Sequence, residues 1–179
     1  MNELTELEKA YLAGFFDGDG CVSIGTRKGK DAATVSHYLQ VIFAQADYDF
    51  LTRWRDKLDA GSIHEDKSRK NLPVRQRMWH WRLHDRLAEG LLRMMVPYLD
   101  IKQVQAEIAL RFMGTKKRGG SCRPTSQGVL QIREHYKNLL HEAKKGKPEP
   151  VPEIDEWESL VDSQLCLFED EKAIIYMQR

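Results

Sequence analysis

The segment that most constrains the fold is Leu12-Ala13-Gly14-Phe15-Phe16-Asp17-Gly18-Asp19-Gly20. Apolar residues recur before and within it at about the 3.6-residue period of a helix, at Leu4, Leu7, Tyr11 and Phe15. Glycine commonly follows the end of a helix, so Gly18 and Gly20 predict that the helix ends there. Two acidic residues, Asp17 and Asp19, are therefore expected at a helix C-terminus.

These two carboxylates face a helix dipole of unfavourable sign. The last carbonyls and the dipole make a helix C-terminus negative, which disfavours each acid by roughly 0.3–1 kcal/mol. A divalent cation would relieve the repulsion, because Mg²⁺ and Ca²⁺ prefer carboxylate and carbonyl oxygens. The alternative is an ordinary helix end followed by a solvated Asp-Gly turn.

Two small residues, Ala13 and Gly14, lie inside the predicted helix. Glycine within a helix costs about 1 kcal/mol relative to alanine, so its presence suggests that another backbone approaches closely. We therefore expect two such helices to pack side by side, with their acidic ends paired.

Composition narrows the class of protein. The chain has 179 residues, of which 41% are hydrophobic, and this is typical of a globular protein. Cys21, Cys122 and Cys166 lack the spacing of disulfide frameworks or zinc sites, which favours a reducing compartment. No segment is apolar enough to predict a membrane span, and the N-terminus is acidic rather than signal-like. We expect a cytoplasmic protein, or one of an organelle matrix or stroma, without a membrane partner.

The net charge of +1 conceals an asymmetry along the chain. Residues 149–179 carry a net charge of −7, and residues 1–148 carry +8. A basic body followed by an acidic tail is typical of nucleic-acid binders. The alternative is a solvated surface of long helical side chains.

Alternating residues predict two β-hairpins, each with one buried and one exposed face. The first hairpin spans residues 21–43, and the second spans residues 62–83. The positions expected to face the core are Val22, Ile24, Val35, Leu39, Val41, Phe43, Trp79, Trp81 and Leu83.

Helical periodicity predicts helices between the two hairpins and after the second one. Asp47 can cap a helix with a buried stripe of Phe50, Leu51, Trp54 and Leu58, and further helices are expected over residues 85–95 and 101–113. The order αββαββα predicts an α+β fold. We divide the chain into a core (1–114), a basic linker and helix (115–147) and an acidic tail (148–179). Thr125 or Ser126 can cap the helix of this extension.

With these segments in order, the chain resembles the LAGLIDADG homing endonucleases, and in particular their single-motif, homodimeric type. The motif matches at Leu12-Ala13-Gly14 and at both aspartates. Further matches lie at Phe43-Ala44-Gln45, at Trp54-Arg55-Asp56-Lys57-Leu58 and over residues 96–106. The resemblance covers roughly residues 5–113, and three signatures in the right order are much more specific than the motif alone.

The resemblance implies a saddle-shaped antiparallel sheet that lies in the major groove of double-stranded DNA. It also implies a homodimer whose motif helices meet at the two-fold axis, and hence a long, (pseudo)palindromic target. The implied activity is that of an intron- or intein-type endonuclease that hydrolyses phosphodiesters with Mg²⁺, or with Mn²⁺ or Ca²⁺ in the same sites. No nucleotide cofactor is implied.

The resemblance also assigns roles to individual residues. Asp19 and the carbonyl of Gly18 correspond to metal ligands. Gln45 corresponds to the residue that positions water or metal near the scissile phosphate, and Lys102 to a basic residue in the water network. Asp17 corresponds to a supporting residue that is hydrogen-bonded at the helix end.

One position departs from the family pattern. Four residues after Gln45, where relatives can carry an active-site arginine, this chain has Asp49. Arg53 lies one helical turn further on. Lys67 or Arg82 could supply the missing charge, and the sequence does not choose between them.

The exposed parity of the strands predicts contacts to DNA. Side chains expected to reach base edges are Ser23, Arg27, Ser36, Tyr38, Gln40, His64, His80 and Arg82. Basic residues expected to contact phosphates are Lys28, Lys30, Arg69, Lys70, Lys116, Lys117 and Arg118. The alternative for each residue is a solvated strand or loop position.

Two functions remain open at this point. The leading hypothesis is a site-specific double-strand DNA endonuclease. The alternative is a non-catalytic RNA-splicing maturase or DNA-binding regulator on the same fold. Asp19, Gln45 and Lys102 together favour the enzyme, because a binder needs no carboxylate aimed at phosphate.

Overall fold

The computed structural model describes residues 3–28, 35–66, 77–116 and 126–146. The helices and strands follow one another as α1 (Glu6–Asp19), β1 (Gly20–Lys28), β2 (Val35–Gln45), α2 (Tyr48–Leu58), β3 (Ser62–Glu65), β4 (Trp79–His84), α3 (Asp85–Met95), the 3-10 helix η3 (Val96–Tyr98), α4 (Gln103–Gly114) and α5 (Gln127–Lys144). The predicted αββαββα order is confirmed, and in the described residues it is followed by η3 and two α-helices.

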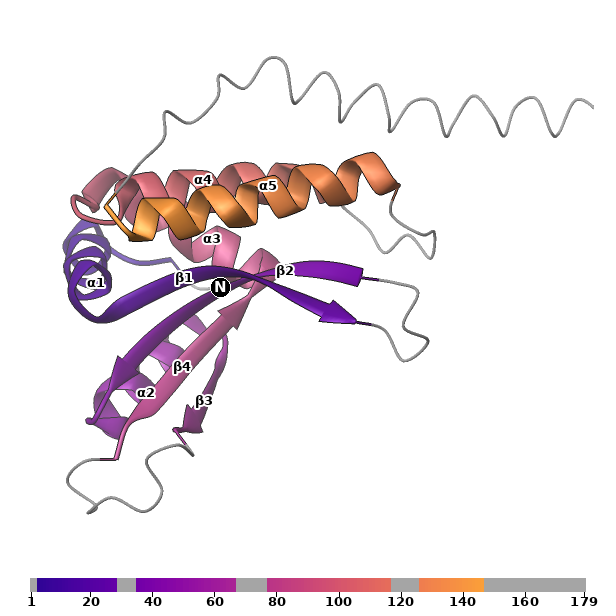
Figure 1. Ribbon diagram of the computed structural model, residues 1–179. Coiled ribbons are helices and arrows are strands. Elements are labelled where there is room, and N and C mark those ends of the chain that lie inside the picture. Colours follow the sequence, from indigo (N-terminus) through magenta and orange to yellow (C-terminus); the bar gives the residue numbers. More distant parts are fainter. Residues whose placement is uncertain (1–2, 29–34, 67–76, 117–125, 147–179) are drawn as a thin grey trace, which may run out of the picture.

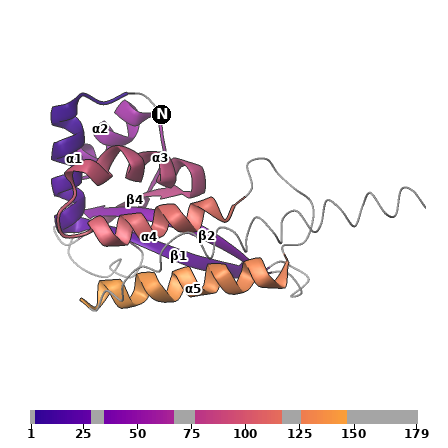
Figure 2. The same ribbon diagram turned by 90° about the horizontal axis from the view of Figure 1, so that it is seen from above.

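The four strands form one antiparallel sheet in the order β1-β2-β4-β3. The sheet is strongly twisted, and α3, α4 and α5 lie above it in the view of Figure 1. The view from above shows α5 alongside α4 (Figure 2). This arrangement leaves the opposite face of the sheet without a covering helix among the described residues.

The predicted alternation along the strands is confirmed. The residues of one face are buried: Val22, Ile24, Leu39, Val41, Phe43, Trp81 and Leu83. Val35 and Trp79, near strand ends, are only half-buried. Because strand side chains alternate between faces, burial of this set directs Ser23, Gln40 and Arg82 to the open face.

The helices bury apolar stripes against the same face of the sheet. In α3, Leu91, Leu92 and Met95 are fully buried. In α2, Leu51 and Leu58 are fully buried, whereas Phe50 and Trp54 are partly buried against the core. The predicted caps Asp47 and Ser126 accept hydrogen bonds from the first-turn amides of α2 and α5.

The last helix is anchored to the core. Ile132, Tyr136, Leu139 and Leu140 of α5 belong to the same cluster of buried residues as the sheet. The buried guanidinium of Arg133 donates to the hydroxyl of Thr115 at 3.1 Å and to its carbonyl at 2.7 Å, at the C-terminal end of α4. Since helix C-termini leave carbonyls unpaired, this cation holds α5 in one position beside α4 and β1.

Some of the sequence predictions concern residues that the structure does not describe. The acidic tail, Thr125, Cys122 and Cys166 lie outside the described residues. Of the helices that the structure describes, none has both the length and the apolar character needed to cross a bilayer.

Candidate active site

The end of α1 meets the turn that leads into α4. The carboxylate of Asp17 accepts backbone N–H bonds from Asp100 at 2.8 Å, Ile101 at 3.3 Å and Lys102 at 2.9 Å. No side chain of its own segment caps α4. Asp17 thus supplies the negative charge that the N-terminal end of α4 favours.

The side chain of Lys102 makes the reciprocal contact. Its ammonium donates to the carbonyls of Phe16 at 2.9 Å and Gly18 at 3.4 Å, and also to the carbonyl of Asp17. These are carbonyls of the last turn of α1. The ammonium of Lys102 therefore offsets part of the negative potential at the end of α1, where the sequence predicted a divalent cation. The carboxylate of Asp17 is already hydrogen-bonded to backbone N–H groups of the same chain.

Burial lowers the pKa of Lys102, while the charges of Asp17, Cys21 and Asp19 act in the opposite direction and Lys144 adds to the lowering. Desolvation penalises the charged form of an amine.

Asp19 differs from Asp17 in its surroundings. It is the last residue of α1 and is exposed, and no hydrogen bond joins its carboxylate to another residue of the described part of the chain. The turn into β1 requires glycine next, because a Cβ on Gly20 would lie 2.0 Å from the ring of Phe16. Tight packing at this turn presents the Asp19 carboxylate to solvent.

Gln45 lies at the same end of the sheet. It ends β2, two residues beyond Phe43, the residue that pairs with Gly20. Its side-chain oxygen accepts the N–H of Ala46 at 2.7 Å, which leaves its amide NH₂ for another acceptor. Asp19, Gln45 and Lys102 thus come from α1, β2 and the start of α4. Lys102 contacts the last turn of α1, whereas Gln45 has the parity of the buried residues Leu39, Val41 and Phe43 and not that of the open face.

The predicted DNA contacts share that open face. In the strand register Ser23 pairs with Gln40, Arg27 with Ser36, and His64 with His80. Tyr38 and Arg82 have the same parity and complete the set. All eight residues predicted to contact bases therefore lie on one surface.

Contacts among these side chains order the surface. The guanidinium of Arg82 donates to Nδ1 of His80 at 3.1 Å, and that of Arg27 lies 5.5 Å from the ring centre of Tyr38. The amide of Gln40 lies 3.4 Å from Nε2 of His84. His84 was missed because the sequence suggested that the strand ends at Leu83, and the parity of β4 could have identified it.

The predicted phosphate contacts divide into two groups. Lys28 is exposed at the end of β1. Lys116 is half-buried and forms an ion pair with Asp85, because the end of α4 lies next to the start of α3. The structure thus shows the ammonium of Lys116 paired within the chain, and its predicted contact with a DNA phosphate stays a prediction. The remaining basic residues lie outside the described ranges: Lys30, Lys67, Arg69, Lys70, Lys117 and Arg118.

The family of this chain follows from its match to a model of a known protein family. A family model described as LAGLIDADG endonuclease matches residues 12–117, which is more than half of the chain.

The chain belongs to the LAGLIDADG endonuclease family.

Solved structures of homing endonucleases share the fold of this LAGLIDADG protein. The structure of I-CvuI with the I-CreI target has a TM-score of 0.65 at 18% identity and covers 88% of this chain and 96% of its own. Archaeal intron-encoded I-Vdi141I with DNA has a TM-score of 0.63 at 14% identity, with the same coverage of 88% and 96%. I-TnaI has a TM-score of 0.54 at 15% identity and covers 81% and 99%. No curated protein sequence matches the chain.

Membership of the family makes the protein a site-specific DNA endonuclease and disfavours the maturase and regulator alternatives. The saddle-type α+β architecture expected from the resemblance is likewise confirmed by the sheet and helices described above.

The motif helix of this LAGLIDADG endonuclease has one exposed stripe. Leu7 is 81% exposed and Tyr11 is 55% exposed, and a Cβ added at Gly14 or Gly18 would meet nothing within 4 Å among the described residues. The stripe positions are spaced by four, three and four residues, so they lie on one side of α1. Ala13 is fully buried instead, because the helix turns it toward the core, and this corrects its expected place at an interface.

Proposed function

We propose that this LAGLIDADG endonuclease acts as a homodimer that hydrolyses both strands of a long, (pseudo)palindromic DNA target with divalent metal ions. The observation that carries the proposal is the position of the exposed Asp19 carboxylate at the end of a helix with an exposed stripe. Dimerisation through that stripe brings two such carboxylates together, one for each DNA strand.

The stripe of α1 has the character of a helix–helix contact. Leu7 and Tyr11 offer apolar surface, while Gly14 and Gly18 leave space for a second backbone. No contact in the described part of the chain requires glycine at either position, although glycine within a helix costs about 1 kcal/mol relative to alanine. Ile101, which is 72% exposed and hydrogen-bonded to Asp17, extends the apolar surface next to the helix end.

The oxygen donors at this helix end fit a hard divalent cation. The Asp19 carboxylate and the Gly18 carbonyl are ligands of the type that Mg²⁺ and Ca²⁺ prefer. Among the described residues no cluster of three or more His, Cys, Asp or Glu could hold a metal ion, so one chain supplies an incomplete site. In a dimer bound to DNA, the second Asp19 and the phosphates would supply the remaining ligands. The related I-CvuI was solved with 2 mM Mg and with 2 mM Ca.

The residues around the metal site have separate tasks. When bound, the cation neutralises charge on the scissile phosphate and activates the attacking water. Lys102 holds the end of α1 through its carbonyls and adds positive charge beside Asp19. The free amide NH₂ of Gln45 orients water or a phosphate oxygen.

Side chains on the open face of the sheet contact the bases of the DNA target. Arg27 and Gln40 have the side chains that suit bidentate contacts to guanine and adenine in the major groove. Lys28, at the end of β1, has the position of a phosphate contact, which fixes register rather than sequence.

Selection of cleaved plasmids tests the activity. A library of randomised palindromes is incubated with the protein and Mg²⁺, and linear products are sequenced. Wild type is expected to yield a family of two-fold symmetric targets, and Asp19→Asn is expected to bind them without cleavage. A wild-type protein that binds DNA tightly but cuts under no divalent metal would refute the proposal. A monomeric mass in the DNA complex would refute the dimer.

A further inference from the structure

The absence of the family arginine at Asp49 leaves a specific requirement for positive charge. Asp49 lies in the first turn of α2 and is exposed. Arg53, one turn further on, lies over the ring of Phe50 with its guanidinium 5.7 Å from the ring centre. Lys67 is outside the described residues. A cation near Asp19 therefore has to come from another element.

The end of α5 brings such a cation to the site. The ammonium of Lys144 lies 3.3 Å from Sγ of Cys21, which is only two residues beyond Asp19. Cys21 is exposed and has the same parity as Ser23, so both point to the open face of the sheet. Lys144 thus reaches the edge of the DNA-facing surface, although its helix packs on the covered side.

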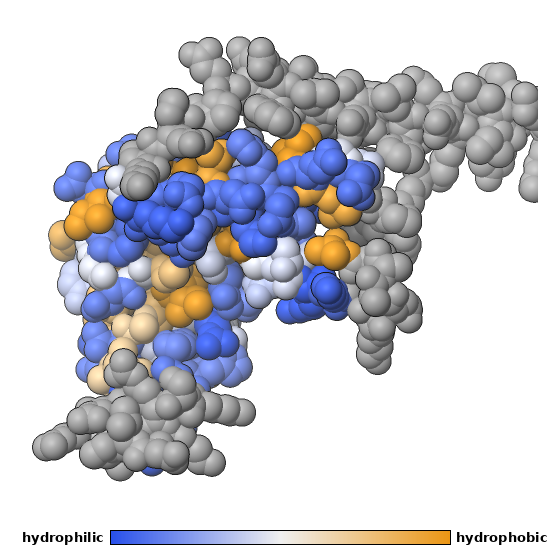
Figure 3. Space-filling view, in the orientation of Figure 1, coloured by the Kyte–Doolittle hydropathy of each residue, from blue (hydrophilic) through white to orange (hydrophobic). Residues whose placement is uncertain are grey.

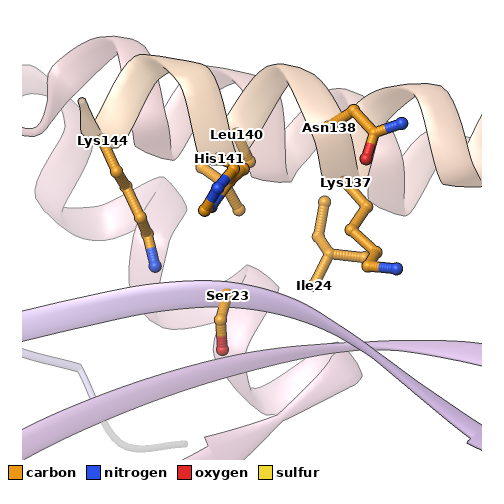
Figure 4. Close-up of a pocket in the computed structure, with 7 residues that line it drawn as sticks. All are labelled: Ser23, Ile24, Lys137, Asn138, Leu140, His141 and Lys144. Carbon is orange, nitrogen blue, oxygen red and sulfur yellow. The ribbon is translucent and has the colours of Figure 1, made fainter. Parts of the chain in front are cut away.

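The cleft between α5 and β1 shows how this is possible. It has a volume of about 310 Å³, and its lining includes Ser23, His141 and Lys144. In Figure 4, Lys144 extends from α5 toward β1, beside the strand that begins after Asp19. The surface over the middle of α5 is largely hydrophilic (Figure 3).

We propose that Lys144 supplies the positive charge at the scissile phosphate that the arginine supplies in relatives. The inference rests on the proposed function and assigns an active-site role to a helix outside residues 12–117, the range that the family model matches. Lys144 is exposed and is the last residue of α5, so its side chain is free to move from the thiol to a phosphate oxygen.

Arg82 is the competing candidate on the open face. Cys21 pairs with Ile42, and Ile42 pairs with Arg82, so Arg82 lies two strands from Cys21. Two strand spacings correspond to about 10 Å. The guanidinium of Arg82 is also bonded to His80 at 3.1 Å. Lys144 instead contacts Cys21, two residues beyond Asp19, and has no carboxylate partner within the described residues.

The chain offers a matched control in the next residue. Lys145 is also exposed at the end of α5, but it is paired with Glu142 at 2.8 Å. Lys144→Ala and Lys145→Ala remove the same charge from the same helix end. Each variant is compared with wild type on the duplex selected by plasmid cleavage, first for binding in Ca²⁺ and then for single-turnover cleavage in Mg²⁺ at saturating protein.

Removing one group that stabilises transition-state charge costs about 10²–10³ in rate within a closed site, so about 10- to 100-fold is expected for the exposed Lys144. Lys145→Ala should change the rate by no more than about twofold, because removal of an exposed surface charge usually has a small effect. Lys144→Arg should restore most of the rate, because the guanidinium keeps the charge. Binding should weaken more in Lys144→Ala than in Lys145→Ala, because only Lys144 is expected to contact the duplex.

A second measurement does not depend on cleavage. Acetylation of lysines, followed by mass spectrometry, should show Lys144 protected by the bound duplex in Ca²⁺ while Lys145 stays reactive. Equal cleavage rates for Lys144→Ala and Lys145→Ala would overturn the inference, and so would a loss of affinity with an unchanged rate at saturation. A large loss of rate in Arg82→Ala alone would assign the charge to Arg82. Failure of wild type to cleave would instead refute the proposed function.

Discussion

Asp17 and Asp19 belong to one motif, but the structure predicts opposite effects of removing them on stability. Asp17→Ala removes the acceptor of three backbone N–H bonds that join α1 to the start of α4. Asp19→Ala removes an exposed carboxylate from the negative end of α1. The first change should destabilise the protein, and the second should be neutral or slightly stabilising.

The magnitude follows from the contacts. A hydrogen bond to a charged group contributes about 1.5–3 kcal/mol when protected from water and about 0.5 kcal/mol when exposed. Two of the bonds to Asp17 are exposed and one is partly buried. Together with a helix-dipole contribution of about 0.3–1 kcal/mol, the loss is about 3 kcal/mol. For a chain of this size, that corresponds to a fall in Tm of roughly 6–12 °C.

Thermal unfolding followed by circular dichroism at pH 7, without metal or DNA, measures both variants. Asp17→Asn should fall between wild type and Asp17→Ala, because the amide keeps one acceptor and turns its NH₂ toward the backbone donors. Asp19→Ala should change the free energy of unfolding by no more than about 0.5–1 kcal/mol. Equal Tm values for Asp17→Ala and wild type, together with loss of cleavage, would refute the capping role and make Asp17 a metal ligand.

Three further predictions follow from other parts of the molecule. Burial alone would raise the pKa of Glu89, but hydrogen bonds from Arg86 and Arg93 outweigh it and lower that pKa. Glu89→Gln should therefore be less stable than wild type by about 1 kcal/mol at pH 7. This difference should be lost as the pH falls through the lowered native pKa of Glu89, and chemical unfolding from pH 7 to pH 3 tests it; a pH-independent difference would contradict it. Leu7→Glu should convert the dimer to a monomer in sedimentation while keeping the Tm of the protomer, and a persistent dimer would exclude this face of α1. Gln40→Ala should relax target specificity at one position of each half-site by about 1–3 kcal/mol in competition binding, and an unchanged sequence profile would remove Gln40 from the reading face.

Much of the fold could be predicted because its determinants are local. The alternation of Leu39, Val41 and Phe43 identifies a half-buried strand at any place in a chain. Asp47 and Ser126 cap the helices that they precede for the same reason, since a cap involves only the next three residues. The face shared by Ser23 and Gln40 also followed from parity once their neighbours were assigned to the core.

The tertiary structure decided what the motif acids do. By helix periodicity and capping alone, Asp17 and Asp19 are equivalent acids at a helix end, and only the family resemblance gave them different roles. They differ because Asp17 meets the amides of residues 100–102 and Lys102 returns to the carbonyls of α1, whereas Asp19 faces solvent. No local pattern encodes a contact between residues more than 80 positions apart. The same reason applies to Lys144, which the packing of α5 against α4 and β1 brings to the thiol of Cys21.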